Sequence, residues 1–391
     1  MTQTIKKMLN DSFAARWTAL ILVASMMFFA YMFVDVLSPL STLLETTKGW
    51  TAENYGTFCS SEYFLNVFAF FLIFAGIISN MFNGVSSMFK SSFIATSLIP
   101  WLQLLAVLVM GRSVNGARRW ISIGGIQFQP SEIAKFAVIL VFARLSREFG
   151  PRAEEFRYGV AGFGAALMGI LVPLALEKHL SAILLIGMVA VVMMFLSGTR
   201  MKFLLLGAAL AGVFVLVYIT FMGYAGDRVT AWLDPQSDPS DTGYQILQSL
   251  YAIGSGGVFG LGFGRGRQKY LYLPFQYNDY IFAIVCEELG LLGAAGIMAL
   301  FAALILRGYH IARKARDRFS TMLCAGLTTL LAVQTVLNLC VVTNMLPSTG
   351  IALPFFSYGG TALAVNLGEM GIILGISRQR EEPKLQEEEM L

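Results

Sequence analysis

The chain has 391 residues, of which 56% are hydrophobic and only 13% are charged, with a formal net charge of +4. Soluble domains carry roughly a quarter charged residues, so this composition excludes an ordinary soluble globular protein. The charges are concentrated in short segments between apolar runs of roughly 20 residues, which is the length that crosses a bilayer. The composition therefore predicts a polytopic helical membrane protein.

Apolar runs bounded by charged or turn-forming residues predict an all-α fold with about ten transmembrane helices. We expect one membrane domain over residues 1–378, a large extracellular loop at about 223–279 between helices 7 and 8, and a cytoplasmic tail at 379–391. The predicted spans lie near residues 17–40, 60–80, 92–111, 131–145, 158–176, 179–197, 203–222, 280–306, 320–343 and 353–376.

The distribution of Lys and Arg predicts the orientation. Most of the 28 Lys and Arg residues fall on the side of the N-terminus, so the positive-inside rule places both termini in the cytoplasm. Cations in two outer loops break this rule, and they indicate an anionic partner there, although a solvated loop would also carry them. The two clusters are Arg112, Arg118 and Arg119, and Arg265, Arg267 and Lys269.

The segment GARRWISIGGIQFQPSEIAK contains the first of these clusters. Arg118 and Arg119 precede Trp120, a turn follows, and a helix then begins with Glu132 in its first turn. Lys135 lies three residues after Glu132, on the same helix face. An ionisable residue within a span is a functional candidate, and a structural ion pair is the alternative.

The long loop begins with turn-forming residues and continues as an amphipathic pattern of Ile246, Leu247, Leu250 and Tyr251. This pattern predicts an interfacial helix. Loops of this length are uncommon unless they have a function, so we expect the loop to face the substrate.

The second cluster lies in the run GVFGLGFGRGRQK, in which glycines alternate with Arg265, Arg267 and Lys269. Alternate glycines could let backbone N–H groups approach phosphate oxygens, and guanidinium groups can chelate the same oxygens. A flexible turn is the alternative. The later segment NMLPSTGIALPFFSYGG is explained mainly as a turn followed by close helix packing.

The segment YNDYIFAIVCEELG contains three carboxylates. We expect Asp279 at the outer mouth of the span near 280–306, with Glu287 about 12 Å deeper in the same helix. That distance is too long for the carboxylate pair of a retaining glycosidase. We predict that Glu287 pairs with Lys135 across the bundle and that Asp279 acts alone at the reacting centre.

These motifs resemble the FtsW/RodA/SpoVE (SEDS) family. The resemblance runs from about Arg112 to Arg378 and includes four long motifs in the right order: GARRWISIGGIQFQPSEIAK, YQILQSLYAIGSGGVFGLGFGRGRQKYLYLP, NDYIFAIVCEELG and LPSTGIALPFFSYGG. The sequence FGLGFGRGRQKYLYLP is closer to that of the FtsW and SpoVE branch than to that of the elongation branch. The approach to Asp279 departs from the family pattern at Phe275 and Asn278, so contacts with the acceptor could differ.

The resemblance implies an inverting peptidoglycan glycosyltransferase on the outer face of a bacterial plasma membrane. It would transfer lipid II disaccharide units with release of undecaprenyl pyrophosphate, in cell division or sporulation. Asp279 would be the general base on the acceptor hydroxyl, and the outer cations would hold the pyrophosphate. The predicted substrate-binding residues are Arg118, Arg119, Trp120, Lys135, Arg265, Arg267, Lys269 and Glu287.

The resemblance also implies partners: lipid II, the nascent glycan strand, a class B penicillin-binding protein and other division proteins, but no nucleic acid. The sequence shows no metal-ligand spacing and identifies no cofactor, although a divalent cation could assist at the pyrophosphate. A lipid II flippase and a non-catalytic division scaffold are the alternative functions. The position of the densest polar segments at one face, without an inverted repeat, favours the enzyme.

Overall fold

The structure is a computed structural model that describes residues 112–114, 117–123, 126–177, 179–221, 223–237, 243–270, 272–274 and 276–378. At 112–114, 117–123, 126–128, 211, 214–221 and 223–227 it describes the backbone alone. The predicted spans near 17–40, 60–80 and 92–111 and the tail at 379–391 lie outside the described residues.

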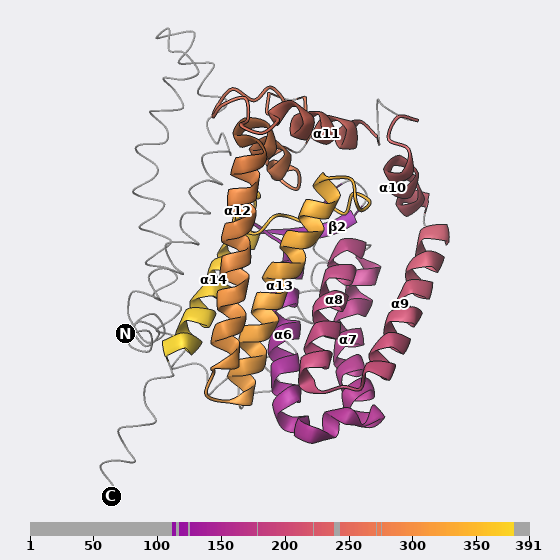
Figure 1. Cartoon of the computed structure of the whole chain (residues 1–391). Helices are drawn as coiled ribbons and strands as arrows, with labels where there is room; N and C mark the ends of the chain where they lie inside the picture. The colour runs from indigo at the N-terminus through magenta and orange to yellow at the C-terminus, as the bar shows by residue number, and fades with distance from the viewer. Residues whose placement is uncertain are drawn as a thin grey trace, which may run out of the picture.

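Long helices dominate the described part of the chain (Figure 1). Five of them are long and apolar enough to cross a membrane. The elements are β1 (Arg112–Val114), β2 (Ala117–Ile123), β3 (Ile126–Phe128), α6 (Pro130–Phe149), η1 (Gly150–Glu154), η2 (Phe156–Gly162), α7 (Phe163–Leu176), α8 (Leu180–Ser197), α9 (Met201–Phe221), α10 (Gly223–Leu233), α11 (Tyr244–Gly256), α12 (Ile281–Arg313), α13 (Arg318–Val342) and α14 (Gly360–Arg378).

The helix α13 lies at the centre of the described bundle, against α12, α6 and α8. Most of its residues are buried, and the helices around it expose apolar side chains on their outer faces, as expected for a protein surrounded by lipid. Local chemistry sets the helix ends. Pro130 begins α6, where its missing N–H costs nothing, and Gly198 ends α8 in the left-handed conformation with φ 97°.

The all-helical prediction needs one addition, a small antiparallel sheet in the order β1-β2-β3. Ile123 pairs with Ile126, so two residues connect β2 to β3. The sequence carried this signal, because alternating apolar residues flank Gly124-Gly125, a dipeptide typical of two-residue hairpins. We had read the segment only as a turn.

The predicted amphipathic helix is present as α11, which lies across one end of the bundle (Figure 1). We call this the α11 end. Ile246 and Leu247 are buried there against α12, whereas Tyr251 is exposed. A second helix, α10, precedes it and was not predicted.

The helix α12 is not one straight rod. Gly290 has φ 67° and ψ −168°, outside helical values, so two helical segments, 281–289 and 291–313, meet there. Only residues 314–317 connect α12 to α13, which makes the two helices antiparallel neighbours. Gly308 packs directly against Thr328 and so gives the register of the pair.

This register shows that the first segment folds back along the second. Asn338 lies about 15 Å beyond Thr328 along α13, so it is level with residue 298 of the antiparallel α12. If α12 were straight, Ile281 would lie about 25 Å beyond that level. Instead, the Asn338 side-chain amide donates to the Asp279 carbonyl oxygen at 2.7 Å. The segment 281–289 therefore begins beside Asp279, deep in the bundle, and rises to Gly290 at the α11 end.

The fold-back overturns the predicted depths of two carboxylates. We expected Asp279 at the mouth of the span and Glu287 below it. In the structure Asp279 is the deeper residue and Glu287 lies near the α11 end. The prediction was wrong because apolar periodicity continues through a single glycine, so the sequence read as one continuous helix.

Substitution of Gly290 tests the fold-back. A Cβ atom there would lie 2.3 Å from the Gly260 nitrogen, and φ 67° strains any L side chain. We expect Gly290→Ala to destabilise the protein by at least about 2 kcal/mol in thermal unfolding of the detergent-purified protein.

Gly296→Ala, in the same helix, is the matched control, because Gly296 has helical geometry and open space around its Cβ position. It should be neutral or stabilise the helix by up to about 1 kcal/mol. Equal melting of the Gly290→Ala variant and the wild type would contradict the fold-back.

Candidate active site

The break in α12 leaves backbone groups without helical partners, and the glycine-rich loop 257–269 supplies them. Leu261 N and Gly262 N donate to the carbonyl oxygens of Glu287 and Glu288 at 3.0 and 3.1 Å. On the other side of the break, Leu291 N and Leu292 N donate to the carbonyl oxygens of Gly257 and Val258 at 2.9 and 3.2 Å. The loop thus satisfies the end of one helical segment and the start of the next.

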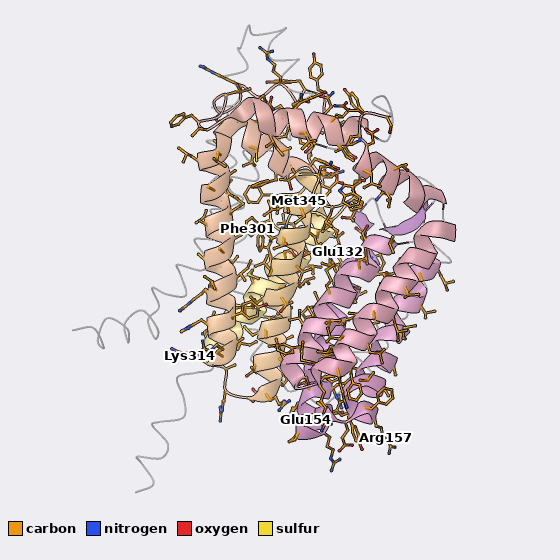
Figure 2. The ribbon with its side chains drawn as sticks, turned by 45° about the vertical axis from the view of Figure 1, so that its right-hand side comes forward. Glu132, Glu154, Arg157, Phe301, Lys314 and Met345 are labelled. Carbon is orange, nitrogen blue, oxygen red and sulfur yellow. The ribbon has the colours of Figure 1, made fainter. Side chains whose placement is uncertain are left out.

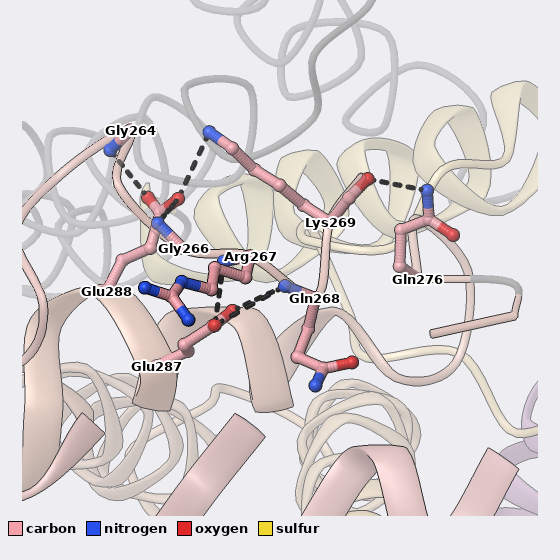
Figure 3. Close-up of polar contacts among 8 residues, drawn as sticks. All are labelled: Gly264, Gly266, Arg267, Gln268, Lys269, Gln276, Glu287 and Glu288. Carbon is pink, nitrogen blue, oxygen red and sulfur yellow. Dashed lines mark hydrogen bonds and ion pairs between the residues drawn. The ribbon is translucent and has the colours of Figure 1, made fainter. Parts of the chain in front are cut away.

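Two buried carboxylates hold the same loop (Figure 3). Glu288, 2% exposed, accepts hydrogen bonds from Gly264 N at 3.0 Å and Gly266 N at 3.3 Å and forms an ion pair with Lys269 Nζ at 3.1 Å. Glu287, 1% exposed, accepts from Arg267 N at 2.8 Å. Its two oxygens also accept from Gln268 N at 3.3 and 3.2 Å. We call this arrangement the carboxylate clamp.

Two glycines of the loop are required by close approach. A Cβ on Gly260 would lie 2.1 Å from the Glu288 carbonyl oxygen, and a Cβ on Gly266 would lie 2.8 Å from Glu287 Oε2. The alternate glycines therefore allow the loop to pack against α12. We had expected their N–H groups to approach phosphate, and the clamp instead assigns those of residues 264 and 266 to the protein's own carboxylates.

The predicted pair between Glu287 and Lys135 is wrong. Lys135, 6% exposed, forms an ion pair with Glu132 Oε2 at 2.7 Å on its own helix. Its charge also acts on the buried Glu369 of α14, which packs against α6. Glu287 is occupied by the loop amides. The i,i+3 spacing of Glu132 and Lys135 was the correct signal.

The side chains of Arg265 and Arg267 remain exposed. Together with Tyr251, Ser255, Leu261 and Gln268 they line a cavity of about 530 Å³ beside α11, to which Glu287 also contributes. Lys269, in contrast, is neutralised by Glu288. The structure thus separates the predicted loop cations into two guanidinium groups at a cavity and one structural ammonium group.

Asp279 lies two residues before the start of the segment 281–289, at the end away from the loop, and its side chain is half-buried. The Asn338 amide donates both to the Asp279 carbonyl oxygen and to Ile351 O, at 2.7 and 2.8 Å. A Cβ on Gly350 would lie 3.8 Å from Asp279 Oδ2. The segment after α13, which the sequence explains mainly as a turn, therefore also lies beside the carboxylate.

The cation that acts on Asp279 is Arg228 of α10. Its Nη1 donates to Ser348 O at 2.8 Å, two residues from Gly350. Burial raises the pKa of Asp279 from 3.8 to about 6, whereas a backbone hydrogen bond and the charge of Arg228 lower it. Asp279 is therefore a base whose pKa lies close to neutral pH.

Sequence reasoning did not single out Arg228, Asn338 or Gly350. The one available signal for Arg228 was its position in the segment that forms the amphipathic helix α10. Arg118, Arg119 and Trp120 lie on β2, and their side chains are outside the described part of the structure. Among the described residues, no group of three or more His, Cys, Asp or Glu side chains could hold a metal ion.

Comparisons with known proteins agree with this architecture. The family model FtsW/RodA/SpoVE, described as "Cell cycle protein", matches residues 19–382. The probable peptidoglycan glycosyltransferase FtsW of Geobacter sulfurreducens is 40% identical over 276 residues, which cover 71% of this chain and 74% of that protein. Stage V sporulation protein E of Bacillus subtilis is 38% identical over 285 residues, which cover 72% and 77%.

A solved structure is also similar. It is described as "Structural coordination of polymerization and crosslinking by a peptidoglycan synthase complex" and matches with a TM-score of 0.71 and 25% identity, covering 94% of this chain and 98% of the other. The fold, the spanning helices and the family model lead to one conclusion: the chain is a multi-pass membrane protein of the FtsW/RodA/SpoVE family.

Proposed function

We propose that the chain is a peptidoglycan glycosyltransferase that polymerises lipid II. The observation that carries this proposal is Asp279, a half-buried carboxylate with a pKa near neutrality, beside a cation and at the start of a helix that folds back into the bundle. The relatives named as glycosyltransferases and the similar synthase structure support it.

In the proposed reaction, the hydroxyl oxygen of the acceptor sugar attacks the anomeric carbon of the donor. A C–O bond forms there as the bond from the same carbon to pyrophosphate breaks, and the leaving pyrophosphate takes the electron pair. The hydroxyl proton passes to the Asp279 carboxylate. A carboxylate with a pKa of about 6 is largely ionised at neutral pH and is still basic enough to accept that proton.

The negative charge that develops on the leaving group needs a cation on the face of the anomeric carbon opposite the attacking hydroxyl. We propose Arg228 for this role, because its charge acts across the same site as Asp279. Arg118, Arg119 and Trp120 remain proposed substrate-binding residues, placed on β2. Lys135 and Lys269 each have a carboxylate partner, so we assign them to holding the site rather than to direct contact with phosphate.

We further propose that the α11 end faces the outside of a bacterial plasma membrane and that both termini are cytoplasmic. Arg157 and Lys314 lie at the opposite end of the bundle, in connections whose sequence is rich in Lys and Arg, while Met345 lies toward the α11 end (Figure 2). The positive-inside rule favours this orientation. A class B penicillin-binding protein is the proposed partner, supported by the similar structure, whose description joins polymerization to crosslinking.

Removal of the proposed base tests the reaction. Asp279→Asn keeps the shape of the side chain but cannot accept the proton, so the rate of lipid II polymerisation should fall by about 100 to 10,000-fold. The purified protein and its partner would be assayed for glycan product on gels.

Asp234→Asn is the matched control, because Asp234 is an exposed carboxylate at the end of α10. It should leave the rate unchanged, and all variants should melt like the wild type. Near wild-type polymerisation by Asp279→Asn would overturn the base assignment and favour the flippase alternative, for which the buried Lys135 and Glu369 and the partly buried Glu132 would be the candidate residues.

The pKa of Asp279 predicts the pH dependence. Only the ionised carboxylate can accept a proton, so kcat/KM should be constant above about pH 7 and fall about tenfold per pH unit well below pH 6. The pH profile would be measured with lipid II under subsaturating conditions.

Arg228→Gln removes a charge that lowers the pKa of Asp279, so it should move the acid limb to higher pH in addition to lowering the rate. An acid limb near pH 4 in the wild type would show that the pKa of Asp279 is not raised in the working enzyme, and an Arg228→Gln variant with an unshifted limb would show that Arg228 does not act on the titrating base.

Reporter fusions test the orientation. A reporter after Arg316 should read as cytoplasmic, and one inserted near Ser240 should read as external, because the loop 223–279 is proposed to lie outside. Reversed readings would place the site on the wrong side of the membrane for the proposed reaction.

A further inference from the structure

The cavity beside α11 is separate from the reacting centre. Glu287, whose carboxylate holds the amides of Arg267 and Gln268, lies about 9 Å of helix rise from Ile281. Asp279 precedes Ile281 at the deep end, and it is not among the residues that line the cavity. The two guanidinium groups therefore lie at the opposite end of a rigid half-helix from the proposed base.

The cavity is suited to an oxyanion that is bound by side chains. The clamp uses the amides of residues 264, 266, 267 and 268, so the loop backbone does not form an anion nest. In the described structure, neither Arg265 nor Arg267 places its guanidinium group in an ion pair. Two guanidinium groups present planar N–H forks that match carboxylate or phosphate oxygens, and the oxygens of Glu287, which also lines the cavity, already accept from loop amides.

The other residues that line the cavity favour an organic ligand over a free inorganic ion. Ser255 and Gln268 offer polar groups, while Tyr251 and Leu261 offer exposed apolar surface. A cavity of about 530 Å³ is within the size range of pockets that hold small organic ligands. A charged contact combined with an apolar wall fits a sugar that carries an anionic substituent better than a free inorganic ion.

We propose that this cavity is a second substrate subsite, which binds a carboxylate or phosphate of the lipid-linked glycan at a distance from the bond being formed. This inference rests on the proposed polymerase function. Binding there holds the growing strand on the enzyme while the released undecaprenyl pyrophosphate leaves the reacting centre and the next lipid II enters it. Arg265 and Arg267 then control the length of the product rather than the rate of a single coupling.

The test compares a double variant, Arg265→Gln with Arg267→Gln, with the wild type in the complex with its partner. Two quantities are measured from lipid II: the rate of the first coupling to the tetrasaccharide product, and the length distribution of long glycan. We expect strands about tenfold shorter, the factor that corresponds to the loss of one charge-assisted contact, and a smaller fall in the first-coupling rate, so that elongation is lost relative to first coupling.

The Arg265→Lys, Arg267→Lys variant is the matched control, since it keeps the charge and loses the planar forks. It should give strands of intermediate length. Wild-type strand length in the double Gln variant would overturn the proposal, and so would equal loss of first coupling and elongation, which would assign both residues to the reacting centre.

Two further experiments use the wild-type complex and need no variant. They therefore test the subsite even if the double variant fails to fold. Lipid II with amidated stem carboxylates should give short strands if the ligand is a carboxylate. Added inorganic pyrophosphate should shorten strands made from unmodified lipid II without slowing the first coupling to the same extent if the ligand is a phosphate. Full-length strands in both experiments would overturn the subsite, whereas a wild-type complex that makes no glycan would instead overturn the proposed function.

Discussion

The carboxylate clamp is the interaction on which the other features depend. Two adjacent carboxylates, at 1% and 2% exposure, would be costly to bury without partners. Four loop amides and the Lys269 ammonium group supply those partners. In return, the loop satisfies the backbone groups that the break at Gly290 exposes. The clamp, the break and the position of Asp279 are therefore one cooperative unit.

This arrangement explains how one region can contain many charges while some groups proposed to meet substrate stay free, within the described structure, of ion pairs with their neighbours along the chain. Charges that hold structure are paired locally: Glu288 with Lys269, and Glu132 with Lys135. Groups proposed to meet substrate are left with access, namely the half-buried Asp279 and the exposed guanidinium groups. The sequence shows only that these charged residues lie close together along the chain. The fold shows which of them have a charged partner and which remain accessible.

Much of the architecture was predictable because long apolar runs and amphipathic patterns depend on local sequence. In the described part of the chain, the predicted spans are occupied by α6, α7, α8, α9, α12, α13 and α14, and α11 matches the pattern of Ile246 and Leu247. The fold-back was not predictable in this way. It needs Gly260, thirty residues earlier, to fit against Gly290, and no periodicity reports such a contact. Arg228 was missed for the same reason, since only the fold brings α10 close to Asp279.

The segment 281–289 also acts as a molecular ruler. A helix has a constant rise per residue, so the number of residues between Ile281 and Glu287 sets the spacing between the base and the loop that carries the guanidinium groups. An inserted residue would lengthen the ruler by about 1.5 Å and rotate its far end by about 100°. Spacing and direction would then change together, so this stretch can tolerate substitutions of side chains far better than changes in its length.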